Sequence, residues 1–366
     1  YKGYTIQPYS PGAGTGLSSH ELNQPGCYRD VKDTTCTALF EISEPKDEWT
    51  KWGRPCFMAW TTTPWTLASN TALCVGPSIK YLAVQTYNPY NDEKLTIIIA
   101  EPLVGSYFNP EGKDLPMDEY KHGDKIVPYR IVGEYMGRDL EGIHYEQLMP
   151  WVKPTAKVDK NSPAFVTEYA TSHPEKVFDA ENGKDKFVEM EECAFRIILG
   201  DYVTTEDGTG IVHIAPTFGA DDAKVAKDAK IPSLFLINKK GETRPMVDLQ
   251  GKYYLIDELD VNFVKECVDV EAYGHHAGDY VKNAYAPEFN KDGKYDEKAA
   301  AKAEDLNIVI CMEMKQDGTV FKIEKHVHNY PHCWRTDKPV LYYPLDSWFI
   351  RSTARKERMV ELNKTI

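Results

Sequence analysis

Apolar residues occur along this chain in many short runs, and a proline, a glycine or a cluster of polar residues ends each of them. Examples are residues 55–63, 71–75, 81–87 and 95–104. Pro64 follows the first of these runs and Gly76 follows the second. Short runs rich in β-branched and aromatic residues, bounded by turn formers, are typical of β-strands. The sequence therefore predicts a fold built from many short strands, and no run approaches the roughly 18 apolar residues of a membrane span.

Longer-period patterns between these runs predict helices. Residues 220–230 (ADDAKVAKDAK) and 259–270 (LDVNFVKECVDV) repeat apolar positions at helical spacing. Residues 195–216 indicate two strands separated by an Asp-Gly turn, and residues 309–334 indicate a hairpin around Asp317-Gly318. With 366 residues, the chain has room for two or three domains. We expect a mixed α+β fold.

Composition narrows the classes of function. Hydrophobic residues make up 42% of the chain and charged residues 27%, which is usual for a globular protein. The formal net charge of −13 excludes nucleic-acid binding by bulk attraction and leaves only a local contact. The eight cysteines form no CxxC pair, which argues against a zinc ribbon or a disulfide framework and for a reducing compartment. Because the chain opens on Tyr1 and ends without a helix cap, we expect an excised piece of a longer protein.

Two polar stretches have the composition of a site. Residues 59–72 (AWTTTPWTLASNTA) place four threonines around a proline and a tryptophan, and residues 207–222 read DGTGIVHIAPTFGADD. The second stretch predicts a strand, a tight loop and a helix start, so that His213 and Asp222 would meet at one crevice. Each signal also has a plain structural explanation: helix capping for the aspartates, core packing for the histidine, and β propensity for the threonines.

The C-terminal part offers a competing site. Residues 326–333 (HVHNYPHC) place His326 and His328 on one face of a strand, with His332 and Cys333 close behind. Histidine and cysteine are the common ligands of zinc, but this spacing matches no common zinc finger. A metal-dependent hydrolase therefore stays open as an alternative.

The combination of the two polar stretches closely resembles the editing domain of isoleucyl-tRNA synthetases. The matching residues are TTTPWTLASN at 61–70 and GTGIVHIAPTFGADD at 208–222. In the first of these stretches the related valyl and leucyl enzymes usually read TTRPET or TTRPDT. The Thr63–Thr66 segment of this chain therefore points to the isoleucyl branch. Ala68, where the family usually has proline, and Ala223-Lys224, where an aromatic residue is common, depart from the pattern without removing a polar group.

The resemblance runs almost from end to end and implies a division of the chain. Residues 1–45 would be a connector from the catalytic domain, 46–320 the editing domain, and 321–366 the return connector. The editing domain would carry insertions near 152–190 and 286–306. In this family it is a β-barrel-like α+β body of many short strands with surrounding helices. Since the HIGH-like and KMSKS-like signatures are absent, the chain should not activate an amino acid.

The resemblance also implies an activity. One missing methylene is worth only about 1–3 kcal/mol in a binding site, and isoleucine against valine in this family is the standard example. A second, hydrolytic site therefore cleaves mischarged valyl-tRNA(Ile). The residues that the resemblance assigns as catalytic are Asp222, Thr62 and Thr63. Those that it assigns to substrate binding are Thr61, Thr66, Trp65, Asn70 and His213.

In this assignment Asp222 pairs with the α-ammonium group of the substrate, and His213 with Thr63 and Trp65 excludes the larger side chain of isoleucine. The remaining threonines and Asn70 bind the terminal adenosine and the attacking water. The implied partners are the 3′ end of tRNA(Ile) carrying valine and the rest of the synthetase, with its Rossmann catalytic and anticodon-binding domains. No cofactor, metal or membrane is implied, and the location is cytoplasmic. A non-catalytic structural or tRNA-docking insert remains a further alternative.

Overall fold

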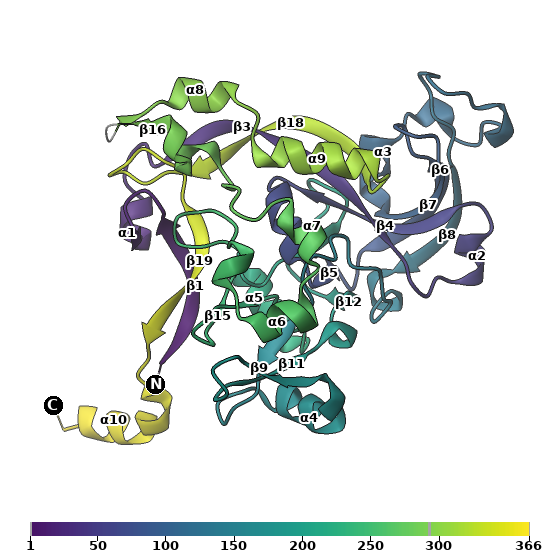
Figure 1. The fold of residues 1–366 in the computed structure, drawn as a ribbon. Helices are drawn as coiled ribbons and strands as arrows, with labels where there is room; N and C mark the ends of the chain where they lie inside the picture. The colour runs from purple at the N-terminus through teal and green to yellow at the C-terminus, as the bar shows by residue number, and fades with distance from the viewer. Residues whose placement is uncertain (1, 292–293, 366) are drawn as a thin grey trace.

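The largest sheet of the molecule has six strands. The computed structural model describes residues 2–291 and 294–365, and in this part of the chain the sheet order is β18 (Val320–Pro331), β3 (Tyr28–Glu41), β4 (Arg54–Thr61), β7 (Lys94–Ala100), β6 (Lys80–Tyr87) and β8 (Arg130–Met136). Strands β4 and β7 run parallel, and the other neighbours are antiparallel. Both faces of β4 and β7 are buried, which explains their almost continuous apolar sequences. Figure 1 shows β3 and β18 as two long neighbouring strands of this sheet.

A three-stranded sheet lies against the end of β4. Its order is β12 (Arg196–Leu199), β5 (Ala72–Val75) and β13 (Ile211–Ile214). The two strands predicted within residues 195–216 are therefore confirmed, but they do not pair with each other. Strand β5 lies between them, parallel to β12 and antiparallel to β13. The residues between β12 and β13 consequently form a long loop beside the end of β4 instead of a hairpin turn.

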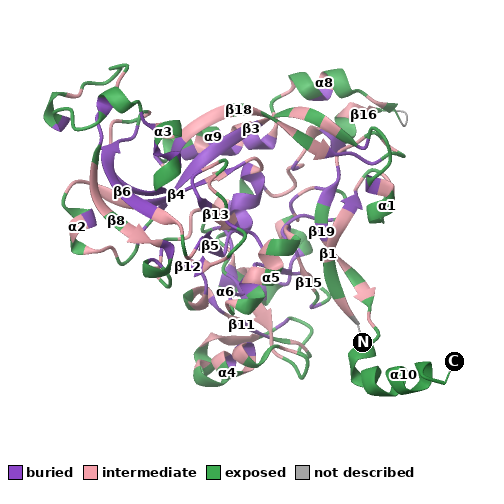
Figure 2. Cartoon of the chain, turned by 180° about the vertical axis from the view of Figure 1, so that it is seen from behind, coloured by how far each residue is buried: buried purple, intermediate pink, exposed green. Residues whose placement is uncertain are grey.

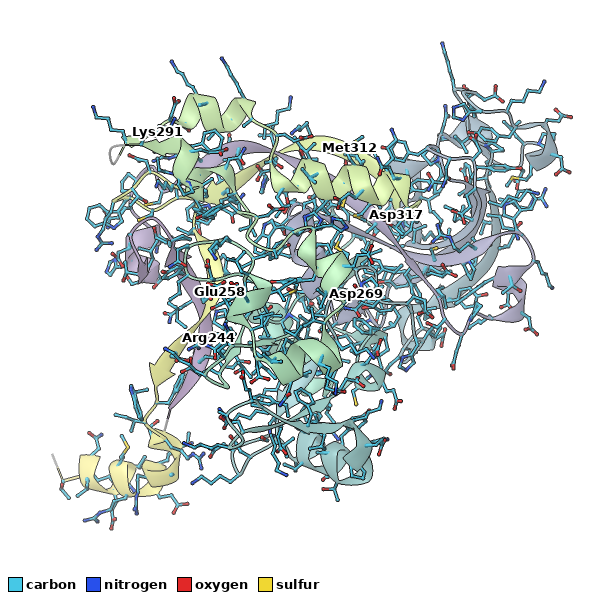
Figure 3. All side chains as sticks on the ribbon, viewed as in Figure 1. Arg244, Glu258, Asp269, Lys291, Met312 and Asp317 are labelled. Atoms are coloured by element: carbon cyan, nitrogen blue, oxygen red, sulfur yellow. The ribbon has the colours of Figure 1, made fainter. Side chains whose placement is uncertain are left out.

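The helices lie around these sheets. They are α1 (Ser19–Leu22), α2 (Asp47–Thr50), α3 (Val104–Tyr107), α4 (Ala164–Ser172), α5 (Ala220–Asp228), α6 (Val261–Cys267), α7 (Val270–Gly274), α8 (Glu297–Lys302), α9 (Leu306–Gln316) and α10 (Lys356–Asn363). The helix predicted over 220–230 is confirmed as α5. The helix predicted over 259–270 divides into α6 and α7, because Asp269, labelled in Figure 3, caps a new helix with its carboxylate.

The hairpin predicted around Asp317-Gly318 is wrong. The residues before this turn form helix α9, which carries Met312, ends at Gln316 and has Asp317 as its C-cap; Met312 and Asp317 are labelled in Figure 3. The Asp305 carboxylate caps the helix by accepting a hydrogen bond from the backbone N–H of Ile308. Gly318, at φ +71°, then reverses the chain into β18. The Asp-Gly pair is thus a helix end, which uses the same turn residues as a hairpin.

Smaller units complete the molecule. Strands β9 (Thr155–Lys157), β10 (Val177–Asp179) and β11 (Lys186–Glu189) form a sheet beside α4, so the polar segment 152–190 has regular structure and its own apolar cluster. The pairs β14 (Leu236–Ile237) with β15 (Thr243–Arg244) and β16 (Asn290–Lys291) with β17 (Lys294–Tyr295) are short. Strand β1 (Lys2–Ser10) pairs with β19 (Leu341–Trp348) and with β2 (Thr15–Gly16), near both ends of the chain.

The predicted fold class, α+β with many short strands, is confirmed. The strands of the described residues form several separate sheets, and these do not close into one barrel. The main apolar core joins the six-stranded sheet to the central helices, whereas α10 is exposed along its whole length (Figure 2). No helix in residues 2–291 and 294–365 combines the length and apolar character needed to cross a membrane.

Candidate functional site

A cavity of about 400 Å³ opens where β4 ends against β13. Its walls come from three places: the threonines after β4, strand β13, and the start of α5. The loop between β12 and β13 forms the remaining side. The lining residues are Trp60–Thr63, Thr66, Tyr202, Thr204, Asp207–His213, Ala215, Phe218 and Asp222. The two polar stretches singled out in the sequence therefore line one cavity, although 134 residues (73–206) lie between them.

The threonine wall is held by its own hydrogen bonds. Strand β4 ends at Thr61, and Pro64 starts a 3₁₀ helix over Pro64–Ser69. The Thr61 hydroxyl accepts a hydrogen bond from the backbone N–H of Thr63 at 3.1 Å, and the Thr66 hydroxyl donates to the Thr63 carbonyl at 2.8 Å. Among the described residues, Thr62 lines the cavity without such a bond for its hydroxyl. Thr62 is therefore the member of this wall whose hydroxyl is free to bind substrate or water; among the described residues, Thr204 is a second lining threonine without such a bond.

His213 has both ring nitrogens engaged. Asn70 Nδ2 donates to the Ala72 carbonyl at 2.8 Å, which fixes the orientation of the amide, and Asn70 Nδ2 lies 3.3 Å from His213 Nδ1. His213 Nδ1 is then an acceptor, so Nε2 carries the proton and donates to the Thr66 hydroxyl at 3.0 Å. Burial lowers the pKa of His213 to about 4. The ring is therefore neutral near pH 7 and forms a fixed part of the wall, not a base.

A second layer fixes the position of His213. The Tyr145 hydroxyl donates to Asn70 Oδ1 at 2.6 Å, and both residues are buried. Asn70 does not itself line the cavity; it contacts the far side of the His213 ring. Since a buried amide without a partner costs about 1–3 kcal/mol, this arrangement resists rotation of the ring. Asn70 and Tyr145 are positioning residues.

Asp222 lines the cavity from the first turn of α5. Its Oδ2 accepts a hydrogen bond from the backbone N–H of Ala215 at 2.9 Å, which ties the helix start to the end of β13. Burial raises the pKa of Asp222 to about 6, the Ala215 hydrogen bond opposes this shift, and the Asp221 carboxylate adds to it. A Cβ atom on Gly219 would lie 2.7 Å from Asp222 Cγ, so a larger residue here would displace the carboxylate from its position.

The loop between β12 and β13 forms one side of the cavity. The Thr209 carbonyl accepts a hydrogen bond from the Ala100 N–H at 2.9 Å, and the Gly210 carbonyl accepts one from the Tyr81 hydroxyl at 2.6 Å. Gly208 and Gly210 both have positive φ, and a Cβ on Gly210 would lie 2.4 Å from that of Ala100. The DGTG sequence is thus a tightly anchored rim of the cavity.

Trp65 lies behind the wall. Its ring packs edge-on against Phe218 with 4.8 Å between centroids, and Phe218 lines the cavity. Its backbone N–H donates to Asn307 Oδ1 at 3.1 Å, and its carbonyl accepts from the Tyr253 hydroxyl at 2.6 Å. Trp65 is therefore not a direct lining residue. It holds the 3₁₀ helix in place and supports Phe218.

The charge of the cavity is negative. Asp207 and Asp222 line it, and no lysine or arginine is among its described lining residues. Such a site attracts a cation of moderate size and repels a phosphate. Together with the hydroxyl groups of the threonine wall, it suits a ligand with an ammonium group next to several hydrogen-bonding oxygens.

Sequence reasoning found part of the lining and missed the rest. The structure brings together Thr61, Thr62, Thr63, Thr66, His213 and Asp222 at the cavity, and it places Trp65 and Asn70 behind the wall. The lining residues that were missed include the side chains of Trp60, Tyr202, Thr204, Asp207 and Phe218. Asp207 and Phe218 belong to the second polar stretch, so the predicted site residues beside them in the sequence could have indicated that they also line the cavity. Tyr145 gave no signal, because it contacts the site only through tertiary packing.

The C-terminal histidines do not converge on a metal site. His328 pairs with Asp33 at 3.0 Å, His332 donates to the Tyr330 carbonyl at 2.9 Å, and His326 packs edge-on against Trp60. Cys333 is buried in a separate apolar cluster. In the described part of the chain, no three His, Cys, Asp or Glu side chains are grouped so that they could hold a metal ion.

Comparison with known proteins gives close relatives. No family model matches the chain. The chain is 64% identical over its whole length to an isoleucine–tRNA ligase of Bacteroides thetaiotaomicron, 53% identical to that of Porphyromonas gingivalis, and 34% identical to that of Clostridium tetani. It covers only 29%, 28% and 24% of these relatives, respectively. The chain thus spans less than a third of their length.

Among solved structures, the chain is similar to leucyl-tRNA synthetase editing domains. The P. knowlesi cytosolic domain matches 81% of this chain and 97% of its own length, with 11% identity and a TM-score of 0.39. A P. falciparum domain matches 80% of this chain and 99% of its own length, with 9% identity and a TM-score of 0.38.

Proposed function

Because this chain belongs to the isoleucine–tRNA ligase family, as a segment of such a ligase, we propose that its cavity hydrolyses the ester of valyl-tRNA(Ile). The observation that carries the proposal is the cavity itself, which Asp222 lines together with several threonine hydroxyls and a fixed, neutral His213. A mischarged 3′ end presents an ammonium group, a small side chain and a ribose, which are the groups that these walls can bind.

Asp222 binds the α-ammonium group of the substrate. An ionised carboxylate in a partly desolvated cavity forms a strong, charge-assisted hydrogen bond. The Ala215 N–H holds one carboxylate oxygen and so fixes the direction of the other. The contact orients the ester between Asp222 and the threonine wall, which lowers the entropic cost of the reaction.

His213 limits the size of the side chain that enters. Its ring is fixed by Thr66 on one side and by Asn70 on the other, so it cannot swing away from a larger ligand. A rigid wall rejects the extra methylene of isoleucine by steric overlap, whereas a flexible one would yield. The cavity therefore admits valine and excludes isoleucine.

Water attacks the ester carbonyl directly. Thr62 binds this water or the terminal ribose, because its hydroxyl is free, and Thr63 and Thr61 complete the polar wall. His213 does not take the proton, since its Nδ1 accepts from Asn70 and its pKa is about 4. The 2′- or 3′-hydroxyl of the substrate ribose is then the group nearest the reaction that can assist the water.

We propose that the rest of the ligase, with Rossmann catalytic and anticodon-binding domains, delivers the tRNA 3′ end to this cavity. Residues 1–45 and 321–366 would connect the editing domain to it, although these segments contain β3 and most of β18, which also belong to the six-stranded sheet. Segments 152–190 and 286–306 would be insertions. The eight free thiols support a location in the cytoplasm, where tRNA is charged.

The proposal is tested by deacylation of valyl-tRNA(Ile) by this chain, with isoleucyl-tRNA(Ile) as the matched control. We expect release of valine, little release of isoleucine, and the same rates with and without a chelator. Loss of activity in chelator would instead favour the metal-dependent alternative. If the chain binds the tRNA and releases no valine, it is a docking insert.

The activity should depend on pH through Asp222. Because burial raises the pKa of this carboxyl to about 6, the carboxylate that binds the ammonium group forms only as the pH rises from about 5 to about 7. We expect kcat/KM for valyl-tRNA(Ile) to rise through this window, after subtraction of spontaneous hydrolysis. Asp222→Asn should remove the rise. A wild-type profile that is flat between pH 5 and 7 would contradict this role.

A further inference from the structure

A second, smaller cavity of about 140 Å³ adjoins the first. Trp60, Asp207 and Gly208 line both cavities, so the two are separated by one shared wall. Gly208 lies over the Trp60 ring, at a position where a Cβ atom would be 3.3 Å from Trp60 Cε3. Since drug-sized pockets measure roughly 300–1,000 Å³, a cavity this small suits one flat ring better than a whole nucleotide.

Aromatic rings form the sides of the second cavity. His326 packs edge-on against Trp60, with 5.3 Å between centroids and 87° between planes. Tyr107 lines the cavity as well and is fixed by a contact of 3.1 Å between its hydroxyl and that of Thr37. Aromatic faces that border a partly exposed hollow are the usual platforms for unstacked nucleic-acid bases.

The charged groups of the cavity are mainly carboxylates. Glu206, Asp207 and Glu324 line it, and the cation Lys322 is paired with Glu324 at 2.8 Å. The excess of carboxylates disfavours a phosphate and favours a ligand that donates hydrogen bonds. A carboxylate is the side chain that reads the exocyclic amino group of cytosine. Uracil carries a carbonyl oxygen at that position and would meet the same carboxylates as an acceptor.

We propose that the second cavity binds the base of the nucleotide that precedes the esterified adenosine, and that it prefers cytosine there. This inference rests on the proposed hydrolytic function, because the ester must occupy the first cavity. All tRNA 3′ ends read C-C-A, so the penultimate base is a cytosine one backbone step from the reacting ribose. Glu206 and Glu324 accept its amino group, and Trp60 or Tyr107 stacks against its ring.

The test uses three small esters and needs no tRNA. The 3′-valyl esters of adenosine, of the dinucleotide CpA and of UpA are hydrolysed by the wild-type chain and by the double variant Glu206→Gln/Glu324→Gln. For the wild type we expect kcat/KM on valyl-CpA to exceed that on valyl-UpA about tenfold. In the double variant this preference should fall to about twofold or less, while the rate on valyl-adenosine stays unchanged. Glu271→Gln, an exposed glutamate on α7 outside both cavities, is the matched control.

The outcomes separate this inference from the function on which it rests. If the wild type cleaves valyl-adenosine but treats CpA and UpA alike, the base site does not exist and the hydrolytic function stands. A cytosine preference that survives in the double variant would also overturn the assignment to these carboxylates. If none of the three esters is cleaved, the proposed function fails, and the base site fails with it.

Discussion

The variant Asp222→Ala is expected to lose about a hundredfold in kcat/KM for valyl-tRNA(Ile). The proposed partner of Asp222 is an ammonium group that leaves water on binding, and an unpaired charge in such a place costs about 3 kcal/mol or more. The loss should not come from unfolding. Because burial raises the pKa of Asp222 to about 6, holding its charged form in the folded chain costs stability at neutral pH.

The neighbouring residue gives the matched control for this experiment. Asp221 carries the same charge in the same first turn of α5, but it is exposed and does not line the cavity. Asp221→Ala should keep the activity within about threefold of the wild type. Thermal unfolding of both variants, measured at pH 7, shows whether the fold is retained. Full hydrolysis of valyl-tRNA(Ile) by Asp222→Ala would exclude the proposed role.

The variant His213→Ala is expected to hydrolyse isoleucyl-tRNA(Ile) at least tenfold faster than the wild type. Removal of the imidazole opens space where a fixed ring limits the side chain, and isoleucine needs room for only one more methylene. Hydrolysis of valyl-tRNA(Ile) should fall only modestly, because His213 is not the base. The measurement compares initial rates on the two charged tRNAs under the same conditions.

The variant Tyr145→Phe tests whether the fixed position of the His213 ring is what excludes the isoleucine side chain. This change removes the hydroxyl that holds Asn70, and therefore loosens His213 without removing it. We expect a smaller gain in isoleucyl-tRNA(Ile) hydrolysis than for His213→Ala. If His213→Ala still rejects isoleucine while it cleaves the valyl ester, then another residue sets the limit.

The sequence predicted helices and strands correctly where the pattern of apolar residues on one face of the element was sufficient to identify it. Helix α5 follows from apolar spacing, and strand β7 from a continuous apolar run. The error at Asp317-Gly318 has a physical cause: an Asp-Gly pair serves equally as a hairpin turn and as a helix end. The choice depended on Asp305 as a cap and on burial of the α9 face, which the pattern of residues 309–316 did not reveal.

For the site, too, the sequence predicted some features and the tertiary structure decided others. The resemblance of two short stretches to a known family selected Asp222, His213 and the threonines, and it alone chose Asp222 over Asp221. By itself the sequence predicted the α+β class and the two polar stretches, and the family resemblance proposed Asp222 as the carboxylate of the site. Only the tertiary structure decided which groups meet. It inserted β5 between β12 and β13, and it brought Tyr145 behind Asn70.

It also placed Trp60 between two cavities. These contacts join residues far apart in the chain, and their formation depends on burial and on buried polar groups finding partners. No period or spacing along the sequence encodes such partners, because they are selected by the packing of the whole molecule.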